Sequence, residues 1–303
     1  MFKSLRTLAF ATLLPFALPT LAQVNATLPA NVQKALQTNK LTGNDLSLVL
    51  IPLDGPGNPT YYNADVSVNP ASTMKLFTTY AALEMLGPTY QWKTEFYTDG
   101  QLKNGVLNGN LYLKGGGDPK LNMEKLWLLM RDLRANGVTK VTGDLVLDRS
   151  YFNIPQLPVF NDDGDDAQAA QRVVRQWLAR KGITAPRLVM ENGSGLSRQE
   201  RVSAREMAAM LQAAWHSPYA AEYISSLPLA GLDGTMRKRL RRTALVGEAH
   251  VKTGTLNTVR ALAGFSRDAS GHNWVVVAIL NSPRPWGASA ILDQVLLSLH
   301  ARK

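Results

Sequence analysis

The chain has 303 residues, a formal net charge of +10 and no cysteine, with 45% hydrophobic and 18% charged residues. This composition is typical of a globular chain with one large or two modest domains, and it excludes an intrinsically disordered one. The lack of cysteine excludes disulfide bonds and thiol catalysis. The basic balance favours anionic surfaces as partners.

The first residues have the pattern of a signal peptide. Lys3 and Arg6 precede an apolar stretch, residues 8–18, and Thr20-Leu21-Ala22 suits cleavage before Gln23. That stretch is too short to span a bilayer, and no later stretch is long enough. We therefore expect residues 1–22 to be a removed signal peptide and the mature protein to be exported.

A hairpin and a buried helix are predicted next. Residues 46–53 and 60–65 read as two strands joined by a turn at 54–57. Residues 74–86 form an apolar helical run that ends at Gly87-Pro88.

The start of this helix carries the first chemical motif, Ser72-Thr73-Met74-Lys75. Residues three apart lie on one face of a helix, so Lys75 can reach Ser72. A serine hydroxyl needs a nearby base to become a strong nucleophile, and a lysine amine can be that base. The free backbone N–H of Ser72 at the helix start could stabilise an oxyanion. A four-residue motif of this kind is weak evidence alone.

The rest of the chain alternates between sheet and helix. A β-rich stretch around residues 92–152 contains a helix near 123–135, and amphipathic helices are predicted at 167–180 and 204–215. A strand ending in Lys252-Thr253-Gly254-Thr255 is followed by strands at 259–265 and 273–280 and by a helix at 288–300. We expect the last three strands to pair with the first hairpin in one antiparallel sheet, with helices on both faces.

Lys252-Thr253-Gly254 is rarer than the serine motif and has a clear physical logic. Gly254 would let a substrate backbone approach the strand. Lys252 offers a positive charge for a carboxylate, and the hydroxyls of Thr253 and Thr255 offer hydrogen bonds. The N–H of Thr255 could be a second oxyanion donor.

The two motifs occur in the order found in serine enzymes that bind penicillin, and four further stretches strengthen the resemblance. These are residues 111–119, 143–152, 191–198 (Glu-Asn-Gly-Ser-Gly-Leu-Ser-Arg) and 226–236. With them the chain resembles the D-alanyl-D-alanine carboxypeptidase/endopeptidase family of class C penicillin-binding proteins, the penicillin-binding protein 4 type. The resemblance covers nearly the whole chain after residue 22.

The chain departs from the family pattern between Phe152 and Asn192, which are only about 40 residues apart. Family members carry more of the second domain there, a third domain and a Ser-x-Asn motif. The only such triplet here, residues 67–69, precedes the nucleophile, and the acidic run 161–166 resembles the junction of an internal deletion. In the family that serine relays a proton and that asparagine binds the substrate amide. The resemblance therefore implies weak turnover with the acylation residues retained.

The resemblance implies a penicillin-binding transpeptidase/β-lactamase-like α/β (α+β) domain, with an antiparallel sheet flanked by helices. Residues 23–90 and 165–303 would form it, and 91–164 would be a partial β-rich inserted domain. The implied activity is a serine-type D-Ala-D-Ala carboxypeptidase/endopeptidase that acts on peptidoglycan peptides in the periplasm, binds β-lactams and needs no cofactor. Its implied residues are Ser72, Lys75 and Lys252 for catalysis and Thr253, Gly254 and Thr255 for substrate binding.

Two other functions stay open. A non-catalytic peptidoglycan- or penicillin-binding remnant would keep the motifs without turnover. A β-lactamase-like enzyme would need a water-activating base, and no glutamate has a recognisable motif for it. The basic run 237–242 lacks interleaved aromatic residues, so we expect no nucleic acid partner and only weak membrane-surface association. The four histidines lack ligand spacing, so no metal site is expected.

Overall fold

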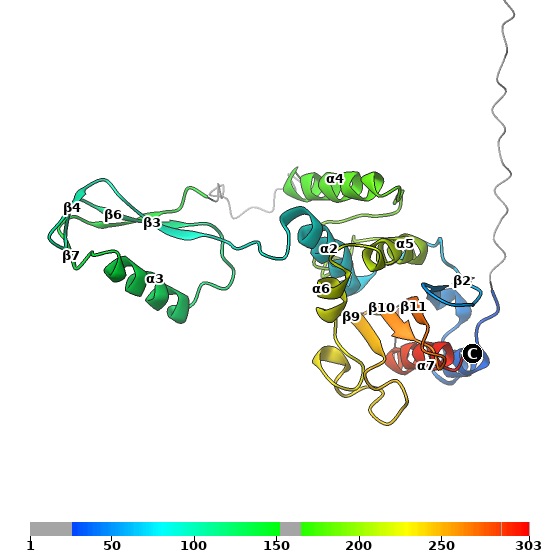
Figure 1. The fold of residues 1–303 in the computed structure, drawn as a ribbon. Coiled ribbons are helices and arrows are strands. Elements are labelled where there is room, and N and C mark those ends of the chain that lie inside the picture. The colour runs from blue at the N-terminus through cyan, green and yellow to red at the C-terminus, as the bar shows by residue number, and fades with distance from the viewer. Residues whose placement is uncertain (1–25, 152–164, 286, 303) are drawn as a thin grey trace, which may run out of the picture.

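The computed structural model describes residues 26–151, 165–285 and 287–302, and Figure 1 shows a main body with an outlying unit beside it. The predicted signal peptide, residues 1–22, lies outside the described residues. The main body contains, in chain order, α1 (Ala30–Thr38), β1 (Leu46–Pro52), β2 (Thr60–Tyr62), α2 (Lys75–Leu86), α4 (Asp165–Arg180), α5 (Ala204–Trp215), α6 (Ala220–Ser225), β9 (Ala249–Leu256), β10 (Val259–Arg267), β11 (Asn273–Asn281) and α7 (Ala288–His300).

One antiparallel sheet organises the main body, with the strand order β2-β1-β11-β10-β9. Strand β1 pairs with β11 from Leu46 opposite Leu280 to Pro52 opposite Trp274. Strands separated by more than 200 residues in the sequence are therefore neighbours. The prediction that the three C-terminal strands join the first hairpin is confirmed, and β9 is an edge strand.

Side chains alternate between the two faces of this sheet, as the two-residue period of a strand requires. In β11, Val275, Val277 and Ile279 belong to one hydrophobic cluster together with residues of α2, α4 and α5. Trp274 and Val276 belong to the other cluster, with residues of α1 and α7. The sheet therefore lies between two helical layers, and both of its faces are buried.

Local signals explain where two of these helices begin. Helix α5 begins after Ser203, whose side chain accepts from the N–H of Glu206 while the Glu206 carboxylate accepts from the N–H of Ser203. The sequence prediction of 204–215 matches this helix. Helix α2 begins at Lys75, directly after a 3₁₀ turn over Ala71–Met74, so Ser72 lies in that turn.

The outlying unit has its own sheets and one helix. Strands β3-β6-β8 form one sheet and β4-β5-β7 the other, and the helix predicted near 123–135 is α3. The elements are β3 (Thr94–Thr98), β4 (Gln101–Lys103), β5 (Val106–Asn108), β6 (Leu111–Gly115), α3 (Met123–Ala135), β7 (Lys140–Val141) and β8 (Leu145–Asp148).

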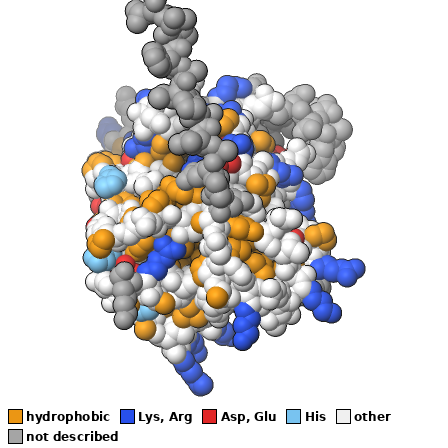
Figure 2. Space-filling view, turned by 90° about the vertical axis from the view of Figure 1, so that its right-hand side faces the viewer, with side chains coloured by type: hydrophobic (Ala, Val, Ile, Leu, Met, Phe, Trp, Pro, Cys, Tyr) orange, Lys and Arg blue, Asp and Glu red, His pale blue; other side chains and the backbone are white. Residues whose placement is uncertain are grey.

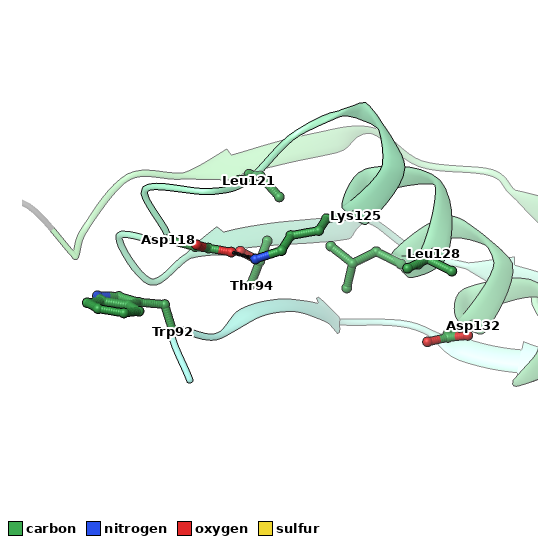
Figure 3. A pocket seen from close by; sticks show the side chains of 8 residues that line it. Trp92, Thr94, Asp118, Leu121, Lys125, Leu128 and Asp132 are labelled. Carbon is green, nitrogen blue, oxygen red and sulfur yellow. Dashed lines mark hydrogen bonds and ion pairs between the residues drawn. The ribbon is translucent and has the colours of Figure 1, made fainter. Parts of the chain in front are cut away.

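This unit buries little apolar surface. No residue of α3 is buried, and Trp127 is 62% exposed. Figure 3 shows a hollow between α3 and the strand at Thr94, spanned by an ion pair of 2.6 Å between Lys125 and Asp118. Among the described residues, no helix has the length and apolar character needed to cross a bilayer.

Candidate active site

The turn that carries Ser72, residues 69–75, is held from both sides; we call it the nucleophile turn. Asn281 at the end of β11 accepts from the N–H of Asn69 at 2.9 Å and donates to the Asn69 carbonyl at 3.0 Å. The Asn69 side chain accepts from the N–H of Ala71 at 2.8 Å and donates to the carbonyl of Ser197 at 3.0 Å. These bonds fix the chain entering the turn to the central sheet and to the loop at 191–198.

Ala71 has a backbone φ of 47°, which is uncommon for a residue with a side chain. Such a conformation persists only where its surroundings fix it, and residues of this kind cluster at functional sites. Here it turns the chain so that Ser72 follows at the start of the helix. Both Ser72 and Lys75 are half-buried.

Lys75 Nζ donates to Ser72 Oγ at 3.3 Å. It also donates to the backbone carbonyl of Ser194. The amine therefore lies between the hydroxyl of Ser72 and the loop at 191–198. A base that takes a proton from a serine nucleophile must lie beside its hydroxyl, and Lys75 lies there.

Two glycines pack against the nucleophile turn. A Cβ at Gly254 would lie 2.8 Å from the carbonyl oxygen of Pro70 and 3.1 Å from the backbone nitrogen of Ser72. At Gly195, where φ is 78°, a Cβ would collide with the carbonyl of Ala71. Strand β9 and the loop at 191–198 therefore reach the turn only because these positions lack side chains.

The outer edge of β9 divides into two halves. Its first half is paired, because Val251 donates to the Pro228 carbonyl at 2.9 Å and Ala249 accepts from Ala230 at 2.9 Å. Among the described residues no strand pairs with the second half, and β9 is the last strand of the sheet. N–H groups of alternate residues point to the same edge, so those of Thr253 and Thr255 face outward as that of Val251 does.

Polar side chains line this unpaired half. Thr253 Oγ1 donates to Thr235 Oγ1 at 2.7 Å, and Lys252 Nζ donates to the Thr253 carbonyl at 2.6 Å. Burial lowers the pKa of Lys252, and the charge of Lys75 lowers it further. The amines of Lys75 and Lys252 are thus close enough to influence each other.

A buried carboxyl lies beneath the loop at 191–198. Glu200 is 0% exposed, and its Oε1 accepts from the N–H of Asn192 at 3.4 Å. Burial raises the pKa of this carboxyl, although backbone N–H groups of the loop act in the opposite direction. The Asn192 side chain accepts from both the N–H and the hydroxyl of Ser194, at 2.9 and 2.8 Å.

All six residues that the sequence singled out lie at this site: Ser72 and Lys75 on the nucleophile turn, and Lys252, Thr253, Gly254 and Thr255 on β9. One detail differs from the expectation for Gly254. The space beside it is taken by Pro70 and Ser72, so its missing side chain serves the approach of the turn.

Sequence reasoning missed Asn281, Glu200 and Thr235, and it assigned no chemistry to Ser194. Asn281 is a polar residue at the end of an apolar run, which is an ordinary strand end by pattern. Only the register of β11 brings it to Asn69.

Away from this site, a second hollow of about 320 Å³ lies at the start of β9, lined by residues that include Trp215, His250 and Phe265. The hollow in Figure 3 is smaller, about 230 Å³, and contains no serine or histidine. Within the described part of the chain, no three His, Asp or Glu side chains gather as a metal site requires.

Solved structures share this fold. The structure of penicillin binding protein 4 (dacB) from Haemophilus influenzae superposes with a TM-score of 0.75 over 90% of this chain and 100% of that chain, at 19% identity. A predatory endopeptidase from Bdellovibrio bacteriovorus, acylated by penicillin G and bound to an immunity protein, superposes with a TM-score of 0.60 over 85% of this chain and 93% of that chain, at 14% identity.

Sequence comparison then identifies the family. The profile of the D-Ala-D-Ala carboxypeptidase 3 (S13) family matches residues 28–166 and 161–296. This chain belongs to that family, as its motifs predict. It is 33% identical to the D-alanyl-D-alanine carboxypeptidase DacB of Haemophilus influenzae over 146 residues, which are 48% of this chain and 29% of that relative.

A D-alanyl-D-alanine carboxypeptidase of Actinomadura sp. is 38% identical over 132 residues, 42% of this chain and 24% of that relative. The matches therefore span less than a third of the length of each of these two curated relatives.

Proposed function

We propose that this chain is a serine-type D-Ala-D-Ala carboxypeptidase/endopeptidase that acts on peptidoglycan stem peptides and is acylated by β-lactams at Ser72. The observation that carries the proposal is the contact of 3.3 Å between Lys75 Nζ and Ser72 Oγ, beside the unpaired half of β9. Membership of the S13 family and the names of the two curated relatives support the same activity.

The substrate peptide would add to β9 as a short strand. Its backbone would bond to the outward groups of Thr253 and Thr255, continuing the pairing that Pro228–Ala230 make with the first half of β9. The terminal carboxylate would lie between the ammonium group of Lys252 and the hydroxyl of Thr253. This arrangement favours a peptide that ends in a free carboxylate.

In the proposed acylation, Ser72, Lys75 and the backbone of β9 each have one role. Ser72 Oγ attacks the carbonyl carbon as its proton passes to the amine of Lys75. The N–H groups of Ser72 and Thr255 stabilise the oxyanion that forms. Water later releases the acyl group from Ser72. The chain lacks a Ser-x-Asn motif after the nucleophile, so we expect a slow enzyme.

Intact mass measured after incubation with penicillin G tests acylation. The native protein should gain the mass of one penicillin, and Ser72→Ala should gain none. A labelled Ser72→Ala protein would overturn the assignment. Release of D-alanine from a D-Ala-D-Ala peptide tests turnover, and we expect rates below the usual enzyme range of about 1–10³ s⁻¹. Penicillin labelling without any D-alanine release would instead favour the non-catalytic remnant.

We also propose that the protein is exported to the periplasm, because residues 1–22 have the pattern of a signal peptide. Secretion of the mature chain with Gln23 at its N-terminus would support this, and retention of residues 1–22 in the cytoplasm would contradict it.

A weak attraction to anionic membranes is also part of the proposal. Arg237, Lys238, Arg241 and Arg242 are exposed, and Arg239 pairs with Asp293 at 2.7 Å. Lys and Arg side chains project from the rim of the face drawn in Figure 2. Sedimentation with vesicles containing anionic lipid should fall with rising salt, because charge attraction is screened. Equal sedimentation with neutral vesicles would refute it.

A further inference from the structure

The proposed reaction needs a proton at the leaving amine, which is a different atom from the one that Ser72 attacks. When the scissile C–N bond breaks, the leaving amine must gain a proton, because a free amide anion is a very poor leaving group. After the attack that proton is on Lys75. A group that lies near Lys75 and can both accept and donate a proton would pass it to the amine.

We propose that the hydroxyl of Ser194 carries this proton from Lys75 to the leaving amine. The inference rests on the proposed function and adds a residue to it. Lys75 Nζ donates to the carbonyl of Ser194, so this residue of the loop at 191–198 already contacts the base. Standard bond lengths keep the hydroxyl and carbonyl oxygens of one serine within about 5 Å of each other. The hydroxyl of Ser194 therefore lies in the neighbourhood of the Lys75 amine.

Other hydroxyls near Lys75 are arranged differently. Thr79 bonds to the Lys75 backbone carbonyl at 2.6 Å, and the Thr78 hydroxyl lies between that carbonyl, at 3.1 Å, and the carbonyl of Gly193, at 3.0 Å, so both hydroxyls bond to backbone oxygens and not to the amine. Thr235 and Thr253 bond to each other on the side of Lys252. Ser194, by contrast, contacts the Lys75 amine itself through its backbone carbonyl and carries a hydroxyl of its own.

One hydrogen bond holds the hydroxyl of Ser194. It donates to the side-chain oxygen of Asn192 at 2.8 Å, so its lone pairs are free to accept a proton, and the hydroxyl must turn from Asn192 to the leaving nitrogen to donate its own. The loop is fixed by the bond of 3.0 Å from Thr78 to the Gly193 carbonyl and by the packing of Gly195 on the nucleophile turn. Ser194 is half-buried, so a substrate can reach it.

The proton balance closes without any other reactant. Ser72 Oγ bonds to the carbonyl carbon, and its proton moves to Lys75. As the C–N bond breaks, Ser194 gives its hydroxyl proton to the leaving nitrogen and takes one from the Lys75 ammonium. The products are the Ser72 ester, a neutral amine, a neutral Lys75 and an unchanged Ser194. The proton of Ser72 has in effect moved to the amine.

Comparing two leaving groups tests the proposal. An acyl-D-Ala-D-Ala peptide releases an amine that needs the proton, whereas a thioester analogue of the same acyl group releases a thiolate that does not. We expect Ser194→Ala to lower kcat/KM about 10²-fold or more for the peptide, and to change it less than about threefold for the thioester. Ser194→Thr, which keeps a hydroxyl, should recover most of the peptide activity.

Ser197→Ala is the matched control, because Ser197 is on the same loop and its hydroxyl bonds to Glu191 rather than toward Lys75. It should affect both substrates little and equally. Equal losses on peptide and thioester for Ser194→Ala would mean that the residue only shapes the loop, and no loss on either would remove it from the reaction; each result overturns the proposal. If the native protein fails to form a Ser72 acyl-enzyme even from the thioester, the proposed function itself fails.

Discussion

Glu84 joins three parts of the helical layer behind the nucleophile, and replacing it is expected to loosen that layer. Its carboxylate accepts from Tyr80 at 2.6 Å, from Trp177 at 2.9 Å and from Ser217 at 2.8 Å, and it pairs with Lys181 at 2.6 Å. These partners come from α2, from α4 and its end, and from the segment after α5. A change of Glu84 to Gln keeps the shape and removes the charge.

The pKa of Glu84 gives the magnitude. Burial alone would raise this pKa, but bonds from Lys181, Tyr80, Trp177 and Ser217 outweigh it and lower the pKa from 4.5 to about 2. A shift of this size corresponds to about 3 kcal/mol of stability, and solvent screening of a side chain that is 13% exposed reduces it to about 2–3 kcal/mol.

The sign of the pH dependence follows from the lowered pKa. The stabilisation is fully present above pH 4.5 and is lost as the pH falls toward 2. Urea unfolding should therefore show Glu84→Gln to be less stable by about 2–3 kcal/mol at pH 7, and by about half as much at pH 3.

Asp65→Asn is the control for this experiment. Asp65 pairs with Arg205 at 2.7 Å, but its side chain is 52% exposed, so the loss should be at most about 1 kcal/mol. A Glu84→Gln protein as stable as the native one at pH 7, or a difference that stays constant down to pH 3, would refute the reasoning.

Three further predictions concern the site itself. Asn281→Ala removes both bonds to Asn69, so it should lower the free energy of unfolding by about 1–3 kcal/mol and slow penicillin labelling. An unchanged labelling rate would contradict the role given to Asn281 in holding the nucleophile turn. Gly195→Ala should abolish labelling because its Cβ collides with the Ala71 carbonyl, whereas Gly182→Ala, which has the same φ range and open space, should label normally. Burial and the charge of Lys75 lower the pKa of Lys252 from 10.5, so Lys252 loses its positive charge before pH 10.5 is reached. KM for a carboxylate substrate should therefore rise with pH below 10.5. A Lys252→Arg protein should not show this rise, because arginine keeps its charge.

The sheet and most helices of the main body could be predicted because their signals are local. Residues 274–280 form a continuous apolar run, and β11 spans Asn273–Asn281. Helix α5 has its capping box in the sequence, at Ser203 and Glu206. The contact between Ser72 and Lys75 also follows from spacing, because three residues on a helical turn bring two side chains together.

The features that hold the site are not local, and sequence patterns could not supply them. Asn69 and Asn281 are 212 residues apart, and nothing in either neighbourhood indicates the other. The positive φ of Ala71 depends on contacts from Asn69 and Gly195. Helix α3 shows another limit of sequence patterns. Its periodicity predicted a helix correctly but could not show whether other elements would cover its apolar side.

Because distant parts of the chain hold the nucleophile turn, acylation of Ser72 reports whether the chain has folded. Ser72 takes its place only when β11 supplies Asn281, the loop supplies Gly195 and β9 supplies Gly254, and these residues come from the last half of the chain. A chain that is still incomplete or unfolded has the serine and the lysine but not the geometry between them. During refolding, labelling by a fluorescent penicillin should therefore measure the folded fraction. The label should appear only after the strands of the central sheet have paired.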